Sequence, residues 1–281
     1  MTSTTLAPFL LPDGFTPPRP TALLREGSLV AEAGRYARQS WRERREHRGT
    51  PYALRAPERL LEPVLLVPGF MAGDGTLALM SRSLRRRGMR TYRSHIHANV
   101  GCTLDAAAQL EERLESLALR RESRVQLVGH SLGGMLARGI AVRRPDLVSG
   151  VVTLGSPMLA PGAHHGLLSR SVGVLVRLSR AGVPGLMAEE CVAGNCARQS
   201  FEESRMPVPA DIDFTTIYSR RDGIVDCRAC VDPAAEAVEV RASHVGMAVD
   251  PQVIDLVAER LRAWSLARAG SVLEVDRGVS A

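Results

Sequence analysis

Lysine is absent from this chain of 281 residues, so all 36 of its basic residues are arginine. Together with the abundance of alanine, glycine and valine, this is typical of a GC-rich bacterial genome. Aromatic residues are also scarce, at 4%. Because proteins that bind single-stranded nucleic acid stack the bases on aromatic side chains, this scarcity argues against that class. The net charge of +6 is also no reason to expect a nucleic-acid partner, since the arginines are spread along the chain and interleaved with 30 acidic residues.

Long apolar segments are absent as well. No apolar run approaches the roughly 18 residues of a membrane span, and residues 1–11 lack the basic region and long apolar core of a signal peptide. We therefore expect a cytoplasmic protein, and its oligomeric state stays open. The length suffices for one large domain that buries most of its apolar surface.

Proline is concentrated near the N-terminus, with five prolines between residues 8 and 20. This density prevents regular structure and predicts an arm on the surface. A helix is predicted next, from about Thr21 to Arg48, and residues 1–58 would pack on the main domain. Alternatively, this basic amphipathic helix lies on anionic lipid as a peripheral membrane contact. The apolar positions at helical spacing are Leu24, Val30, Ala33, Ala37 and Trp41.

Strand and helix patterns alternate from residue 59 to residue 268, which predicts one α/β domain with a mostly parallel sheet flanked by helices. Residues 157–210 interrupt the alternation with an apolar helical stretch. This insertion is either a cap or lid whose apolar face holds an acyl chain, or a packing helix. Residues 269–281 are predicted to be a flexible tail. The predicted strands are 63–67, 89–93, 124–128, 150–154, 214–218 and 237–241, and the predicted helices include 76–87, 104–119 and 251–264.

The motif Gly129-His130-Ser131-Leu132-Gly133 lies between a strand pattern and a helix pattern. That is the context in which Gly-x-Ser-x-Gly presents a nucleophilic serine on a sharp turn, with glycines leaving space for it. Ser131 is therefore the candidate nucleophile. It needs a neighbouring base, because a free serine hydroxyl reacts weakly at neutral pH. The alternative is a small-residue turn with an inert serine.

A base and a carboxylate follow the last two predicted strands. Asp222 comes after one and His244 after the next, so in a parallel sheet both would reach the edge that carries Ser131. A serine nucleophile needs such a base, and the base needs a carboxylate to hold its tautomer. Asp226 is the rival acid, and Asp222 is favoured because it lies nearer the strand end. His130 is expected to be a packing residue.

Residues 68–75 form a glycine-rich loop directly after a buried strand. Such a loop is suited to presenting backbone N–H groups to a developing negative charge. The alternative is an ordinary turn between a strand and a helix.

The loop at residues 68–75, the Ser131 motif and the segments around Asp222 and His244 follow one another in an order that resembles the α/β-hydrolase family. The resemblance is specifically to its bacterial, actinobacterial-like lipase and esterase members and extends over roughly residues 60–265. The resemblance implies Ser131 as nucleophile, His244 as general base and acid, and Asp222 as orienting carboxylate, with the backbone N–H groups of Phe70 and Leu132 as the oxyanion hole. One departure is that Pro68-Gly69 stands where many lipases have His-Gly. The matching segments are residues 67–70, 128–134, 153–157, 219–225 and 243–247.

Metal binding is the less favoured interpretation of two groups of residues. His95 and His97 would face the same side of a strand, yet no third ligand is evident. The close cysteine pairs have the spacings C-x4-C and C-x2-C, without the compact pattern of a zinc ribbon, and free or partly paired thiols are favoured. We expect no cofactor and no metal. The five cysteines are Cys102, Cys191, Cys196, Cys227 and Cys230.

The sequence thus predicts a serine hydrolase that cleaves small-molecule or lipid-like carboxylic esters through an acyl-enzyme. An acyltransferase with the same three residues remains an alternative, since it differs in how well the site excludes water. A non-catalytic binding protein on the same fold is the second alternative, because a fold does not fix function.

Overall fold

A parallel sheet forms the centre of the molecule in the computed structural model, which describes residues 6–46 and 62–278. Six strands lie in the order β2-β1-β3-β4-β5-β6, and every neighbouring pair runs parallel. The predicted α/β class is confirmed. The strands are β1 (Val64–Val67), β2 (Thr91–Arg93), β3 (Val125–His130), β4 (Val148–Leu154), β5 (Asp213–Tyr218) and β6 (Glu236–Glu239).

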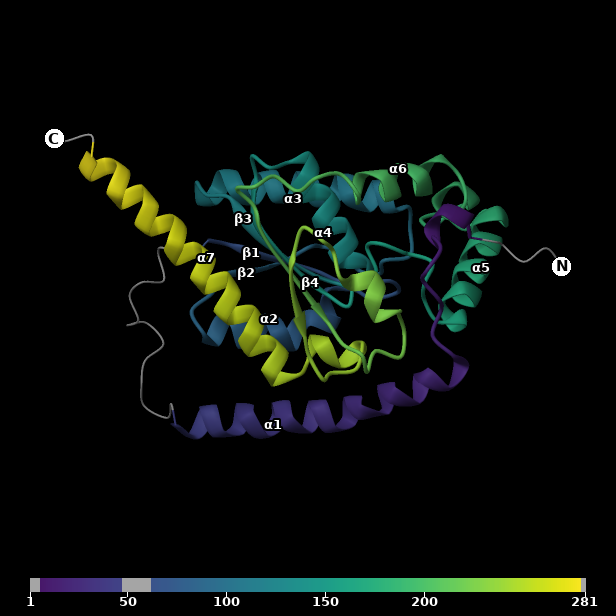
Figure 1. Ribbon diagram of the computed structural model, residues 1–281, viewed down its shortest axis with the longest axis horizontal. Helices are drawn as coiled ribbons and strands as arrows, with labels where there is room; N and C mark the ends of the chain where they lie inside the picture. Colours follow the sequence, from purple (N-terminus) through teal and green to yellow (C-terminus); the bar gives the residue numbers. More distant parts are fainter. Residues whose placement is uncertain (1–5, 47–61, 279–281) are drawn as a thin grey trace.

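Helices cover both faces of this sheet (Figure 1). One face packs against α3 and α4, and the other packs against α2 and α7, with α1 on the outside of that layer. The helices are α1 (Leu29–Glu46), α2 (Ala78–Arg86), α3 (Thr103–Arg121), α4 (Leu132–Arg143), α5 (Gly166–Arg180), α6 (Asn195–Glu203) and α7 (Pro251–Gly278).

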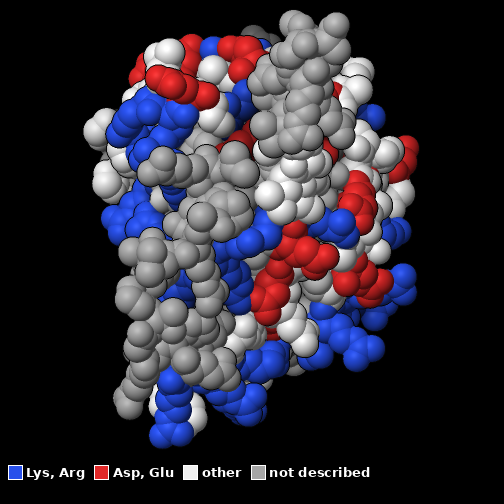
Figure 2. All heavy atoms as spheres, turned by 90° about the vertical axis from the view of Figure 1, so that its left-hand side faces the viewer, with Lys and Arg blue, Asp and Glu red and all other residues white. Residues whose placement is uncertain are grey.

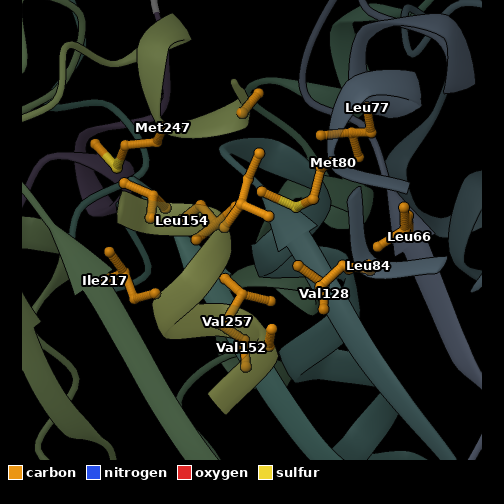
Figure 3. Close-up of a cluster of buried hydrophobic side chains, with 14 of the residues drawn as sticks. Leu66, Leu77, Met80, Leu84, Val128, Val152, Leu154, Ile217, Met247 and Val257 are labelled. Atoms are coloured by element: carbon orange, nitrogen blue, oxygen red, sulfur yellow. The ribbon is translucent and has the colours of Figure 1, made fainter. Parts of the chain in front are cut away.

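The short apolar strands are explained by this double cover. Successive side chains of a strand point to opposite faces, so Val64 and Leu66 of β1 enter the core beside α2 and α7, whereas Leu65 and Val67 enter the core beside α3 and α4. All four are buried, as expected for a strand covered on both sides. Figure 3 shows the first of these cores, in which side chains from α2 and α7 meet those of the sheet.

The carboxyl ends of the strands share one edge of the sheet, and the predicted functional segments follow them there. Ser131 follows β3, and the segments that carry Asp222 and His244 follow β5 and β6. A buried ion pair joins the helix after Ser131 to the segment after Asp222. In this pair Arg138 of α4 lies 2.6 Å from Asp232, which follows the short 3₁₀ helix η7 (Cys227–Cys230). The fold therefore gathers distant parts of the chain at a single edge.

The N-terminal helix docks by a different face from the one its apolar spacing predicted. It begins as the 3₁₀ helix η2 (Pro20–Ser28) and continues as α1. Leu24, Val30 and Trp41 point outward, with exposed fractions of 82%, 80% and 54%. The docked positions include the polar Glu32, which is fully buried because it hydrogen-bonds a loop of the domain. The predicted end of the helix at Arg48 lies outside the described residues.

The C-terminal segment also differs from the prediction. Helix α7 continues to Gly278, well beyond residue 269, where the flexible tail was predicted to begin. A single glycine such as Gly270 costs about 1 kcal/mol inside a helix and does not by itself end one. The predicted flexible tail is therefore not found over residues 269–278, which are helical.

Acidic and basic residues are mixed on the face shown in Figure 2. Figure 2 shows acidic and basic side chains intermingled on the end of the molecule where α7 finishes, with arginines along the lower edge. Within residues 6–46 and 62–278, none of the helices combines the length and apolar character needed to cross a bilayer.

Candidate active site

Ser131 lies on a strained turn between β3 and α4. Its backbone has φ +54° and ψ −123°, a conformation that residues with a side chain rarely adopt. The Ser131 N–H donates to the Leu154 carbonyl oxygen at 2.8 Å, which ties the turn to the end of β4. A side chain at Gly133 would overlap the Val67 and Pro68 carbonyl oxygens, and one at Gly129 would overlap the backbone of Gly134. The sequence forms this turn because glycine allows the close approach.

His244 and Asp222 are paired and almost fully buried. The Nδ1 atom of His244 lies 2.6 Å from Asp222 Oδ2, while Asp222 Oδ1 accepts the N–H groups of Ile224 and Val225 at 2.8 Å each. Burial alone lowers the pKa of His244, but the charge and hydrogen bond of Asp222 outweigh it and raise that pKa above its usual value. The carboxylate therefore holds the ring with its Nδ1 proton toward Asp222, which leaves Nε2 to exchange protons.

The rival acid is occupied elsewhere. Asp226 accepts hydrogen bonds from Arg228 at 2.6 Å and from the Thr16 N–H at 3.1 Å. The structure therefore brings Asp222, and not Asp226, against His244.

His130 packs directly against His244. Their ring centroids are 4.9 Å apart, and His130 Nε2 lies 2.9 Å from the His244 carbonyl oxygen. Burial, and secondly the neighbouring His244, lowers the pKa of His130 to about 4. A neutral His130 thus donates from Nε2 and supports the His244 loop beside Ser131. Among the described residues no hydrogen bond joins the Ser131 hydroxyl to the His244 ring, and such contacts are often long in sites without substrate.

Two backbone N–H groups beside Ser131 are free of protein acceptors. Neither Phe70 nor Leu132 donates a backbone hydrogen bond within the part of the chain that the structure describes. The Phe70 loop is held in place by Asn99, whose side chain donates to the Pro68 carbonyl oxygen at 3.1 Å and whose backbone oxygen accepts the Met71 N–H at 3.0 Å. Leu132 is the first residue of α4, where the helix dipole adds positive potential. These N–H groups are available to an oxyanion.

A carboxylate from the N-terminal helix bridges the two loops that carry His244 and Asp222. Glu26 Oε1 accepts the N–H groups of Gly223 at 2.9 Å and His244 at 3.0 Å, and Oε2 accepts that of Val245 at 3.0 Å. Its negative charge also contributes to the raised pKa of His244. The position of His244 therefore depends on a segment near the start of the chain.

A second carboxylate of the same helix supports the residue before His244. Glu32 accepts the Ser243 N–H at 2.8 Å and the Ser243 hydroxyl at 2.7 Å. Sequence reasoning missed both glutamates. The available signal was the presence of glutamates in a helix otherwise rich in arginine.

An apolar pocket opens beside Ser131 and spans about 860 Å³ when the space open to solvent is included. Its walls come from the turn at Ser131 and the start of α4, here called the elbow, from the 157–210 insertion and from the N-terminal arm. The arm does not simply lie on the surface, because Ala7 and Leu10 are buried and the Gly162 N–H donates to the Leu10 carbonyl oxygen at 2.6 Å. Apolar lining residues outside the elbow include Leu6, Leu10, Leu168, Val172, Met187 and Phe201.

The two histidines considered as metal ligands lie in the loop after β2. His95 has φ +69°, and its N–H donates to Asp74 Oδ2 at 3.0 Å. Within residues 6–46 and 62–278, neither His95 nor His97 belongs to a cluster of three metal-ligating side chains.

Comparison with known proteins connects this geometry to a family. A family model for the alpha/beta hydrolase fold matches residues 81–176, from α2 through the Ser131 turn into α5. A triacylglycerol lipase from Vibrio cholerae serotype O1 is 33% identical over 140 residues, which cover 47% of this chain and 40% of that lipase. The chain therefore matches less than half of that relative's length.

Solved structures share the architecture over most of the chain. The mature lipase BlEst2 of Bacillus licheniformis superposes with a TM-score of 0.58 at 15% identity, covering 76% of this chain and 96% of that one. A monoacylglycerol lipase from Paleococcus ferrophilus gives 0.51 at 16% identity, covering 73% and 94%. At these identities the similarity establishes a common fold.

We expect Asp222→Asn to lower the pKa of His244, because the substitution removes the charge that raises it. The pKa is measured by NMR titration of the histidine rings, with His244→Gln identifying the signal. Asp226→Asn is the matched control and should leave the His244 titration unchanged. The opposite pattern, a shift in Asp226→Asn and none in Asp222→Asn, would overturn the pairing.

Proposed function

We propose that this chain, which shares the α/β-hydrolase fold, hydrolyses carboxylic esters of the lipase or esterase type through an acyl-enzyme intermediate on Ser131. The observation that carries the proposal is the convergence, at one sheet edge, of a strained serine, a buried His–Asp pair and two free N–H groups beside an apolar pocket. The related proteins named as triacylglycerol and monoacylglycerol lipases support an ester substrate.

The first half of the proposed reaction forms the acyl-enzyme. His244 Nε2 accepts the Ser131 proton as Oγ attacks the ester carbonyl carbon. The carbonyl oxygen becomes an oxyanion that accepts hydrogen bonds from the Phe70 and Leu132 N–H groups, a contribution of about 10² to 10³ in rate per donor. The protonated His244 then gives its proton to the leaving alcohol, and Asp222 stabilises the charged ring meanwhile.

The second half releases the acid. A water molecule loses a proton to His244 and attacks the acyl carbon, and the Ser131–acyl bond breaks as Ser131 regains a proton from His244. Because the base must be neutral to begin each half, activity should rise with pH through the elevated pKa of His244.

The pocket indicates the substrate class. Leucine, valine, methionine and phenylalanine side chains from the insertion and the arm surround the space next to Ser131, so burial of an apolar acyl chain is favourable by about 0.8 kcal/mol per CH₂. We assign the insertion, residues 157–210, as the cap over the acyl chain of the substrate.

The outward face of α1 fits an anionic lipid surface. Val30 and Trp41 lie exposed on it, and the neighbouring Arg38, Arg42 and Arg45 are exposed as well. A basic amphipathic helix of this kind binds in the headgroup region, with each arginine contributing about 1 kcal/mol. We assign this face as a peripheral contact with lipid that presents ester substrates.

Ser131→Ala should abolish ester hydrolysis, with kcat lower by roughly 10⁶-fold, because no other group replaces the nucleophile. The measurement pairs p-nitrophenyl esters of increasing chain length with a fluorophosphonate probe, read by intact mass and peptide mapping. One adduct on Ser131 is expected in the wild type and none in Ser131→Ala or His244→Ala. Adduct formation elsewhere, or full activity of folded Ser131→Ala, would refute the mechanism.

Glu26→Ala should lower kcat by about 10- to 100-fold with little change in KM, because misplacing His244 by about 1 Å costs this much and Glu26 does not line the pocket. The acid limb of the pH profile should also shift to lower pH, since a negative charge near His244 is lost. Glu26→Gln should recover part of kcat but not the pH profile. Glu236→Gln, on a surface ion pair, serves as the control, and an unchanged pH profile in Glu26→Ala would exclude the positioning role.

Wild-type protein should co-sediment with vesicles that contain anionic phosphatidylglycerol, and binding should weaken as salt rises because the attraction is screened. Trp41→Ser and Arg42→Glu should each weaken it. Leu119→Ser removes an exposed apolar side chain from α3 and should have no effect. If Trp41→Ser and Arg42→Glu bind the vesicles as well as the wild type does, this face of α1 is not the lipid contact.

A further inference from the structure

Three of the five cysteines converge at the base of the insertion. Cys102 caps the N-terminus of α3, Cys191 ends the 3₁₀ helix η6 (Glu189–Cys191), and Cys196 lies in the first turn of α6. Their Sγ atoms all lie within 4.8 Å of one another. Of these three cysteines, only Cys191 and Cys196 are close in the sequence, and the fold brings Cys102 to them.

The spacing of these thiols suits a single metal ion. Zinc–sulfur bonds are about 2.3 Å long, and a tetrahedral ion therefore holds its sulfur ligands roughly 3.8 Å apart. Small side-chain rotations bring three sulfurs from within 4.8 Å to that separation. Within the described ranges, this is the one group of three or more histidine, cysteine or acidic side chains whose ligand atoms lie this close together.

The backbone around the cluster is already in place. The Met187 N–H donates to the Val100 carbonyl oxygen at 2.9 Å, and the hydroxyl groups of Thr103 and Ser200 lie 3.0 Å apart. These bonds hold the segments of the insertion against the start of α3 on both sides of the thiols. A metal ion would meet ligands that need little reorganisation, which favours affinity.

The electrostatic surroundings also favour a cation. The acidic residues Glu190 and Asp105 lie near Cys196. Negative charge beside a cluster of thiols attracts a divalent cation.

We propose that Cys102, Cys191 and Cys196 bind a thiophilic metal ion, Zn²⁺, which clamps the 157–210 insertion to α3. Three S–Zn bonds form as the three thiols release their protons to solvent, and no oxidant or reductant is required. Cys191 also lines the pocket beside Ser131. The clamp therefore fixes one wall of that pocket, whatever reaction takes place in it.

The experiment measures metal binding by the full chain, independently of any activity. Reduced protein is titrated with Zn²⁺ in competition with a chromophoric chelator, and Co²⁺ is added in parallel to record thiolate-to-cobalt charge-transfer absorption. We expect one Zn²⁺ per chain, release of protons and a higher Tm. Cys102→Ser, Cys191→Ser and Cys196→Ser should each weaken binding by at least about 100-fold and remove the absorption, since each loses one thiolate bond.

Cys227→Ser and Cys230→Ser provide the matched controls, because these two cysteines lie outside the cluster. Both should bind Zn²⁺ as the wild type does. The proposal is overturned if the reduced wild type binds no Zn²⁺, if the three cluster variants bind it as well as the controls, or if mass mapping of protein purified without reductant shows a disulfide between two cluster cysteines.

Discussion

The backbone turn at Ser131 is the constraint on which the rest of the site depends. A residue with a side chain holds φ +54° there because the Ser131 N–H is bonded to Leu154 and because Gly69, Gly129 and Gly133 let β3, α4 and the loop after β1 touch. Such a conformation costs about 1 to 3 kcal/mol and persists only where its surroundings determine it fully. The cores on the two faces of the sheet supply that support. The backbone at Ser131 is therefore fixed, and the residue lines the pocket without a change of backbone conformation.

Much of this arrangement could be predicted because its signals are local. Buried parallel strands are short apolar runs, and the Gly-x-Ser-x-Gly turn is contiguous, so β1, β3, β4 and Ser131 were identified from neighbouring residues. Asp222 and His244 were found because parallel strands end at a common edge. The proposed oxyanion role of the Phe70 and Leu132 N–H groups came from the family resemblance, since backbone atoms leave little trace in a sequence.

The remaining features depend on contacts between distant segments. The apolar stripe of α1 predicted a helix but not its orientation, because the docked face is determined by hydrogen bonds that Glu26 and Glu32 accept from loops more than 190 residues away. Cys102 joins Cys191 and Cys196 only after α3 and the insertion have packed. The arm reaches the pocket through a bond between Gly162 and Leu10 that no periodicity encodes.

The dependence of His244 on Glu26 orders events in the life of the chain. These residues are separated by 218 positions, and a ribosome makes the N-terminal helix long before the loop that it supports. The two glutamates can accept these hydrogen bonds only after the segment with Ser243 and His244 has been made. A chain that stopped before residue 243 would contain Ser131 but lack His244, so the proposed reaction would begin only late in synthesis.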